Sequence, residues 1–209
     1  MPAVTTTESP RPRRLSKEAR RAQLLDTAGE LLLCDGVDAL TMEGIGQGAG
    51  ASKTLGYAYF DNVDHVIVAL RERELGRLYV RVQGAAAEVD GLEAKVAAAF
   101  GAYFDICVER GLLLGELEHA VSARRISTPD SDGTNAFLEW LAELIDAELG
   151  VGTKRAWAYA AVVASNANMH AGIWRYTGFS RRHMESTAVA FAVGGLLAAV
   201  AHDNAQLRR

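Results

Sequence analysis

The chain has 209 residues, of which 49% are hydrophobic and 23% charged, with a net charge of −4 at pH 7. This length suffices for one or two hydrophobic cores. The first residues lack the apolar segment of a signal peptide, and the longest apolar run, Ala188 to Ala201, is too short and too glycine-rich to cross a bilayer, so we expect a cytoplasmic protein with no membrane partner.

Residues 1–14 are rich in proline, threonine and arginine, a composition that predicts a disordered basic arm. Arg13 and Arg14 could follow a DNA backbone or enter a minor groove, while a solvated tail is the alternative. The first 60 residues contain seven Lys/Arg and seven Asp/Glu, so the remainder of the chain accounts for the net charge of −4. A local basic patch is therefore compatible with an acidic protein.

The first predicted helix follows Ser16, a good capping residue, and runs to about Cys34. Its leucines and alanines recur at helical spacing and form one apolar face for a small three-helix core. Asp35-Gly36 ends it, because glycine accepts the left-handed conformation that commonly follows a helix.

The stretch from Thr41 to Phe60 predicts two short helices around a tight turn. Thr41 can cap the first helix and Ser52 the second, and Ala49-Gly50-Ala51 forms a bend small enough for the helices to cross closely. A capped helix start exposes backbone N–H groups that suit phosphate, and its first-turn side chains can reach bases in a major groove. This pattern is typical of a helix-turn-helix.

On these residues the chain resembles the TetR/AcrR family of bacterial transcriptional regulators, whose pattern is T-x-x-x-I-A-x-x-A-G-V-S-x-x-x-L-Y-x-Y/H-F. The matching residues are Thr41, Ile45, Ala49, Gly50, Ser52, Tyr57, Tyr59 and Phe60. The resemblance is specific across roughly Leu15 to Leu70. It implies an all-α fold, with a helix-turn-helix DNA-binding domain at residues 15–61 and a ligand-binding and dimerisation domain at residues 62–209.

The resemblance also implies which side chains contact DNA. We expect the capping hydroxyls of Thr41 and Ser52 to hold phosphates. The first-turn residues of the second helix, Lys53, Thr54 and Leu55, should face bases. The hydroxyls of Tyr57 and Tyr59 should donate hydrogen bonds to the DNA backbone. Core packing is the alternative for the tyrosines, and we place Phe60 in the core.

Several positions depart from the family pattern. Gly44, Gly46 and Gly48 replace an acid or alanine, and each interior glycine costs roughly 0.5–1 kcal/mol of helix propensity. Gly56 replaces a leucine, and Val63 replaces a lysine that touches phosphate in the family. The sequence therefore predicts a helix-turn-helix that is loosely packed without DNA, and weak or cooperative DNA binding.

The rest of the chain is helical throughout, with no strand-like alternation. The predicted helices run from Asn62 to about Gln83, Leu92 to Arg110, Leu112 to about Arg124, Thr134 to Leu149, about Thr153 to Tyr176 and about Ser180 to Asn204. The first of these links the head to the body, and in the family it transmits the ligand signal.

Aromatic and polar residues of the body predict a cavity for a hydrophobic or amphipathic small molecule. The candidate lining is Tyr103, Phe104, Cys107, Phe137, Trp140, Asn166, Met169, His170 and Trp174. Core packing explains each aromatic side chain equally well on its own. Asn166 and His170 lie one helical turn apart, as either a hydrogen-bonded pair or a polar anchor for a ligand.

The last helix carries small residues at steps of four, three and four: Ala188, Ala192, Gly195 and Ala199. A bulky stripe runs beside them, which predicts burial on two sides. We expect one side to face the core and the other to pair with the same helices of a second copy, forming a homodimer. A central core helix in a monomer is the alternative. A dimer would place two recognition helices on a palindromic operator of double-stranded DNA.

Catalytic patterns are scarce. Glu116 and His119 form one Glu-x-x-His, whereas di-iron bundles need it twice, so we expect no metal, no cofactor and no enzyme activity. The sequence favours a ligand-responsive regulator, a repressor released from its operator by the small molecule. The other hypothesis is an all-α small-molecule binding protein or enzyme whose DNA-binding head has decayed.

Overall fold

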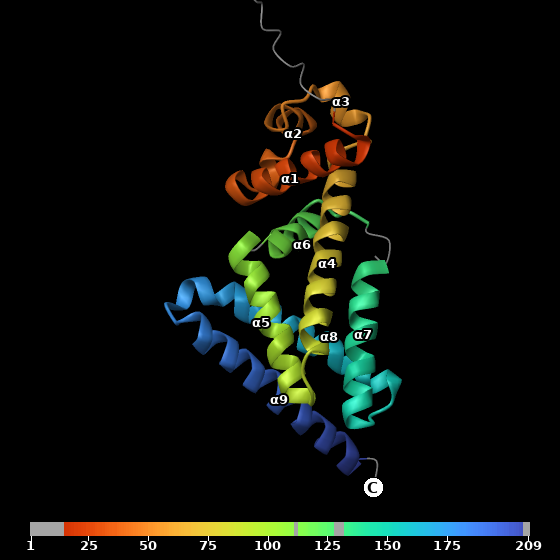
Figure 1. The fold of residues 1–209 in the computed structure, drawn as a ribbon, viewed down its shortest axis with the longest axis vertical. Coiled ribbons are helices and arrows are strands. Elements are labelled where there is room, and N and C mark those ends of the chain that lie inside the picture. The colour runs from red at the N-terminus through yellow and green to blue at the C-terminus, as the bar shows by residue number, and fades with distance from the viewer. Residues whose placement is uncertain (1–14, 111–112, 128–131, 207–209) are drawn as a thin grey trace, which may run out of the picture.

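The computed structural model describes residues 15–110, 113–127 and 132–206. Across these ranges the chain forms nine α-helices and a short 3-10 helix, with no strand, which confirms the all-α prediction. Figure 1 shows an elongated molecule with a small head at one end and a larger helical body at the other.

The head contains α1 (Lys17–Asp35), the 3-10 helix η1 (Val37–Ala39), α2 (Met42–Gly48) and α3 (Lys53–Tyr57). The Ser16 hydroxyl caps α1 by accepting a hydrogen bond from the Ala19 amide at 3.1 Å. After α1 the chain turns at Gly36, whose φ is +80°. Leucines of α1 and Ile45 of α2 are buried in the core that holds these helices together.

The long helix α4 (Val63–Ala87) connects the head to the body. Its first turn is capped by Asn62, whose Oδ1 accepts from the His65 amide at 2.9 Å. The early residues of α4, such as Ile67, belong to the core of the head, whereas Leu78 and Val82 belong to the core of the body. One helix therefore runs through both cores.

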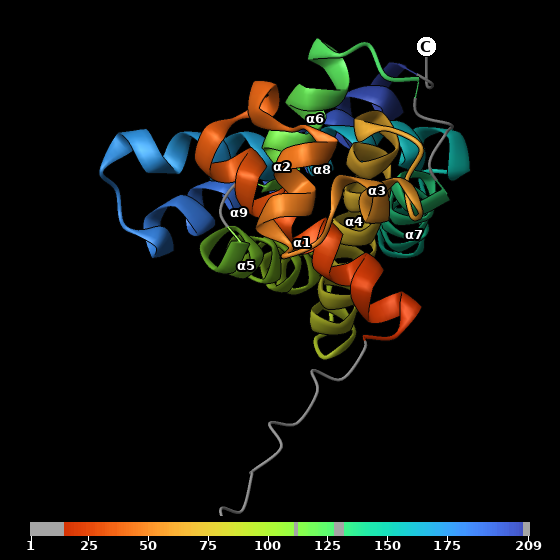
Figure 2. The ribbon, with the colours of Figure 1, turned by 90° about the horizontal axis from the view of Figure 1, so that it is seen from above.

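The body is built from α5 (Leu92–Arg110), α6 (Leu113–Ala123), α7 (Asp132–Leu149), α8 (Thr153–Thr177) and α9 (Arg181–Gln206). Helix α7 packs on α8, α5 packs on α4, and α9 lies against α5 and α8. Seen from above, the α8–α9 hairpin projects from one side of the molecule, as Figure 2 shows. These bounds confirm the predicted helices, although α4 ends four residues later than expected and α7 begins two residues earlier.

Helix α6 is shared between the two parts of the molecule. Leu113, Leu117 and Ala120 on α6 are buried in the same core as α1 and the start of α4. The packing of the head thus extends beyond residue 61, to a helix some 50 residues later in the chain. No local pattern in the sequence indicates this contact, because it depends on the tertiary fold.

Helix α9 is long and apolar enough to cross a membrane by length and composition alone. Only 28% of its most apolar window is buried in the chain. Core helices of soluble proteins pass the same test, so this property is weak support for a membrane span. The low burial instead leaves apolar surface on α9 open.

Candidate nucleic-acid interface and ligand cavity

Both short helices of the head begin with the predicted hydroxyl caps. Thr41 Oγ1 accepts from the Gly44 amide at 3.0 Å, and Ser52 Oγ accepts from the Leu55 amide at 3.1 Å. The turn between the helices passes through Gly50, whose φ of +59° lies in the left-handed region that glycine adopts without strain. The cap and turn predictions for this segment are confirmed.

Two of the unusual glycines lie at close helix contacts. A Cβ on Gly46 would lie 3.2 Å from the carbonyl oxygen of Ala51 and 3.3 Å from the Lys53 nitrogen. A Cβ on Gly48 would lie only 2.6 Å from Cγ2 of Thr27 on α1. These glycines weaken α2 as an isolated helix, but they let α1 and the start of α3 approach it closely. The predicted looseness of this segment therefore stays a prediction.

The side chains predicted to meet DNA differ in exposure. Thr41, Ser52, Lys53 and Thr54 are exposed, Tyr57 is 48% exposed, Leu55 is half-buried, and Tyr59 is half-buried against the head core. Phe60 is buried, as expected, with the Arg21 guanidinium 5.2 Å from its ring centre. Arg13 and Arg14 lie outside the described residues. The exposed surface of α3 thus consists of an amine, hydroxyls and a phenol.

An open groove runs beside these residues, and the sequence did not indicate all of its lining. Lys53 and Tyr57 border the groove together with Asn62, Asp64 and Arg124. Arg124, just after α6, forms an ion pair with Asp64 at 2.7 Å. This pair neutralises one of the acids that flank Val63. Arg124 lies 60 positions from its partner, so only the fold brings it to this surface.

The described part of the head is acidic. From Leu15 to Asp64 the basic residues are Lys17, Arg20, Arg21 and Lys53, and the acidic residues are Glu18, Asp26, Glu30, Asp35, Asp38, Glu43, Asp61 and Asp64. That is four against eight. Two of the acids are paired with arginines from elsewhere in the chain: Asp26 with Arg73 and Asp64 with Arg124. Attraction to DNA from this region alone would be weak.

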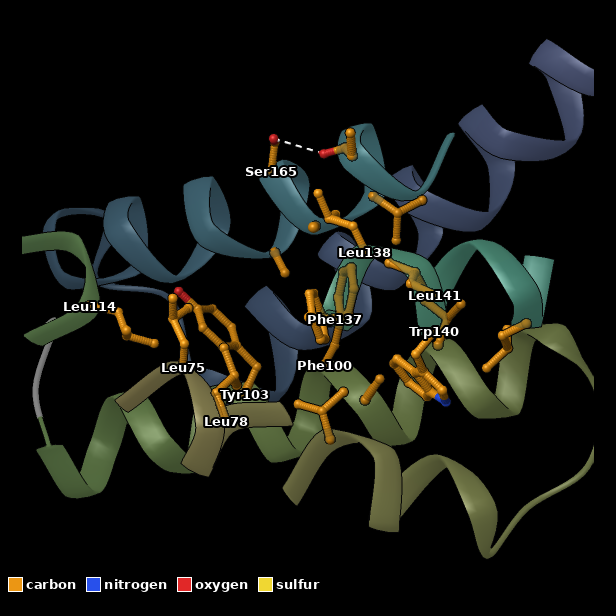
Figure 3. Close-up of a pocket in the computed structure, with 18 of the residues that line it drawn as sticks. Leu75, Leu78, Phe100, Tyr103, Leu114, Phe137, Leu138, Trp140, Leu141 and Ser165 are labelled. Atoms are coloured by element: carbon orange, nitrogen blue, oxygen red, sulfur yellow. Dashed lines mark hydrogen bonds between the residues drawn. The ribbon is translucent and has the colours of Figure 1, made fainter. Parts of the chain in front are cut away.

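The body contains a cavity of about 340 Å³ that is partly open to solvent, shown in Figure 3. Five helices line it, and nearly all of the lining side chains are apolar. They are Leu75, Leu78 and Val82 of α4; Lys95, Val96, Ala99, Phe100 and Tyr103 of α5; Leu114 and Glu118 of α6; Phe137, Leu138, Trp140, Leu141 and Leu144 of α7; Ala161, Val163, Ala164, Ser165 and Ala167 of α8.

Three of the predicted ligand-binding residues, Tyr103, Phe137 and Trp140, line this cavity. The rings of Phe137 and Trp140 pack against each other, with centroids 5.9 Å apart. Burial, followed by the neighbouring Cys107, raises the pKa of Tyr103 far above its ordinary value. Cys107 lies beside Tyr103 and borders a smaller pocket.

The other predicted ligand-binding residues lie elsewhere. Phe104 is fully buried in the core against Trp174, with ring centroids 5.8 Å apart. His170 Nδ1 lies 3.0 Å from the main-chain oxygen of Asn166, so the pair that the sequence suggested forms through the backbone. Oδ1 of Asn166 is buried without a hydrogen-bond partner among the described residues. Met169 is 66% exposed on the outside of α8.

The predicted dimer stripe on α9 divides between two environments. Ala188 and Ala192 are buried in the body's own core, whereas Gly195 is exposed and Ala199 is half-buried. The large exposed apolar side chains of the two last helices are Trp157, Val162, Met169, Ile173 and Tyr176 on α8, and Phe191 and Leu197 on α9. His170 stacks on Phe191 at 5.8 Å, so the exposed surfaces of α8 and α9 adjoin.

A three-helix head with a capped helix-turn-helix, joined through one long helix to an all-α body, is the fold of the TetR-family transcriptional regulators. No protein-family model and no curated protein matches the sequence. Solved structures match it over most of their length. A putative transcriptional regulator from Pseudomonas aeruginosa PAO1 has a TM-score of 0.70 and 20% identity, and the match covers 90% of this chain and 96% of that one.

Two further structures extend the comparison. A TetR-family transcriptional regulator from Streptomyces coelicolor has a TM-score of 0.65 and 21% identity, with 87% of this chain and 99% of that one covered. The regulator FadR from Bacillus subtilis, in complex with stearoyl-CoA, has a TM-score of 0.61 and 16% identity, with 83% and 98% covered. At these identities the likeness establishes the fold.

Proposed function

We propose that this chain is a ligand-responsive DNA-binding transcriptional regulator that acts as a homodimer in the cytoplasm. One observation carries the proposal: α6 contributes to two places at once. Leu114 and Glu118 of α6 line the cavity, while Leu113, Leu117 and Ala120 pack into the core of the head. A molecule in the cavity therefore contacts a helix that supports the head. The TetR-family fold of the chain supports the same function.

The DNA contacts in this proposal begin at the caps. Thr41 and Ser52 accept backbone hydrogen bonds with their hydroxyl oxygens, which leaves their O–H groups to donate to phosphates. Lys53 and Thr54 are exposed in the first turn of α3 and would face bases, with Leu55 offering apolar contact. Tyr57, Tyr59 and the arm residues Arg13 and Arg14 would contact the backbone.

Release from DNA follows from differential binding. The ligand must bind the DNA-incompetent arrangement more tightly, because a ligand with equal affinity for both arrangements shifts nothing. Leu114 and Glu118 are positioned to sense the ligand, and Arg124, just after the same helix, touches the start of α4 through Asp64. A shift of α6 would thus move the head relative to α4, and in a dimer would change the separation of the two heads. We propose repression with release by ligand.

Dimerisation supplies the second recognition helix. The exposed apolar surface of α8 and α9 is larger than scattered surface residues require, and such patches mark interfaces. Pairing two copies through these helices would form a four-helix interface around a two-fold axis. The structure of FadR with stearoyl-CoA supports the view that a protein of this fold can bind a small molecule. No catalytic activity, metal or cofactor is part of the proposal.

The acidic head favours a second candidate function, an all-α small-molecule binding protein or enzyme whose head no longer binds DNA. Gly56 and Val63, and the excess of acids between Leu15 and Asp64, are the observations behind it. This candidate predicts only non-specific DNA retardation that disappears as salt is raised.

A gel-shift titration with the DNA flanking the protein's own gene separates the two candidates. We expect specific retardation at moderate salt, lost in the Lys53→Ala/Tyr57→Ala double variant by at least about tenfold in affinity, because base and backbone contacts are each worth about 1–3 kcal/mol. Lys154→Ala, an exposed lysine at the start of α8, is the control and should bind as the wild type does. Equal affinity of both variants would reject the regulator.

A further inference from the structure

The charged side chains of the ligand cavity are already paired within the protein. Lys95 Nζ lies 2.5 Å from Oε1 of Glu148, and both side chains are about three-quarters buried. Oε1 of Glu118 lies 2.6 Å from Nε of Arg71; the Arg71 side chain is 11% exposed and that of Glu118 is 47% exposed. The lining therefore contributes one cation and one anion, each with its own counterion.

Two uncharged polar side chains of the cavity, Ser165 and Tyr103, already have hydrogen-bond partners in the protein. Ser165 donates its hydroxyl proton to the main-chain oxygen of Ala161 at 2.8 Å, and Figure 3 shows this hydroxyl directed away from the cavity. The buried phenol of Tyr103 has Cys107 as a hydrogen-bond partner. The rest of the described lining consists of leucines, valines and alanines and of the rings of Phe100, Phe137 and Trp140.

We propose that the effector of this cavity is an uncharged, predominantly apolar small molecule, and that anionic and cationic amphiphiles are excluded. The inference rests on the proposed function and narrows its ligand class. A buried head group with a charge would lack a counterion, or would have to take Lys95 from Glu148 and leave that carboxylate unpaired. Because removing an unpaired charge from water is unfavourable, the lining favours an uncharged ligand.

The size of the cavity sets a further limit. Its volume of about 340 Å³ lies at the lower end of the roughly 300–1,000 Å³ that small-molecule sites span. A single short aliphatic chain or a small ring system suits this space. The affinity would come from apolar surface removed from water, and not from directed hydrogen bonds.

Calorimetric titration of the full chain with a matched series tests the charge selectivity. The probes are 1-decanol, decanoate and decylammonium, used near pH 7 and below the concentrations at which any of them forms micelles. They share one apolar chain and differ in the charge of the head group. We expect 1-decanol to bind at least about tenfold more tightly than either ion, because only the ions enter with an unpaired charge.

Cavity-filling variants show where the alcohol binds. Ala164→Phe and Ala99→Leu each add volume to the wall, from α8 and α5 respectively. Both should lose 1-decanol binding by at least about tenfold, and circular dichroism identifies any variant that fails to fold. Two variants are used so that the failure of one to fold leaves the other. If alcohol binding persists in both folded variants, the cavity is not its site and the inference fails.

Replacing the ion pair tests the role of Lys95 itself. In the Lys95→Met/Glu148→Met double variant, decanoate should bind no more weakly than it does to the wild type, since the inference gives it no ion pair with Lys95 to lose. The inference is overturned if decanoate binds the wild type as tightly as the alcohol and loses that affinity in this variant. It is also overturned if decylammonium binds equally well, or if none of the three probes binds.

A parallel gel shift keeps the failure of this inference distinct from the failure of the proposed function. If 1-decanol binds in the cavity but leaves DNA affinity unchanged, the ligand class stands and the regulatory function falls. If decanoate, and not 1-decanol, releases the DNA, the regulatory function stands and the ligand class falls.

Discussion

At the scale of single residues, the contact of Gly48 with Thr27 predicts an unusual reversal. In most helices glycine to alanine is stabilising by roughly 0.5–1 kcal/mol. At position 48 the new Cβ would lie 2.6 Å from the Thr27 methyl, a distance that real Cβ atoms do not show. Gly48→Ala should therefore lower the free energy of unfolding by about 1–2 kcal/mol, measured by urea denaturation.

Two companion variants test the cause. Thr27→Ser removes the methyl group, so adding Gly48→Ala in that background should be neutral or stabilising. Gly84→Ala in α4, where a Cβ meets nothing within 4 Å, should be stabilising in the wild type. A destabilisation at position 48 that persists in the Thr27→Ser background would show that the Thr27 methyl is not its cause.

At the scale of helices, a buried carboxylate joins three of them. Glu74 of α4 is 3% exposed, and its Oε1 accepts from Arg77 at 2.9 Å and from Arg110 of α5 at 3.2 Å. The same oxygen accepts from Arg73, whose guanidinium also lies 2.8 Å from Asp26 of α1. The cluster thus ties the head to α4 and α5 through one side chain.

Glu74→Gln should lower the free energy of unfolding by about 2–3 kcal/mol, because it leaves three arginines without their shared counterion. Urea denaturation measures the change. Glu109→Gln is the matched control, since Glu109 also links α5 to an arginine of α4, through two hydrogen bonds from Arg81, but is exposed. The control should be destabilised far less. Equal destabilisation would mean that burial of Glu74 contributes nothing.

Local signals in the sequence predicted the elements well. Helix starts depend on one side chain three residues from an amide, so Ser16, Thr41 and Ser52 were identifiable as caps without the fold. The helical period likewise located the long helices. The cap at Ser52 likewise located the first turn of α3 from its residues alone.

Sites assembled from distant segments could not be read in the same way. Lys95 pairs with Glu148 across 53 positions, and Arg124 with Asp64 across 60. Helical periodicity shows that a residue such as Met169 or Ala188 lies on an apolar face, but not whether that face turns to the core, to the cavity or to solvent. Met169 proved exposed, and Ala188 proved fully buried.

At the scale of the whole molecule, DNA binding requires positive charge from outside the described head. Arg11, Arg13 and Arg14 precede the described residues and add three cations to a region that holds four basic and eight acidic side chains. Replacing all three with alanine should reduce the slope of log affinity against log salt by up to about 3, near 0.9 for each phosphate that an arginine no longer neutralises. Arg182→Ala, exposed on α9, is the control and should leave the slope unchanged.

The second prediction for the whole molecule concerns dimerisation through the exposed surface of the α8–α9 hairpin. Phe191 is 65% exposed beside His170, and the apolar window of α9 is mostly uncovered in a single chain. If a second copy covers this face, Phe191→Glu places a charge in the interface and should convert the dimer to a monomer in light scattering. Operator affinity should fall with it, because a monomer presents one recognition helix instead of two.

Val80→Glu is the matched control for that charge. Val80 is 69% exposed on α4, which packs mainly on α5, α6, α1 and α7, so the same substitution there should leave the dimer and its DNA affinity intact. If Phe191→Glu also remained a dimer, the pairing surface would lie elsewhere on the body. If the wild-type protein were a monomer in light scattering, the proposed dimer interface would be rejected, and the apolar face of α9 would have no second copy to cover it.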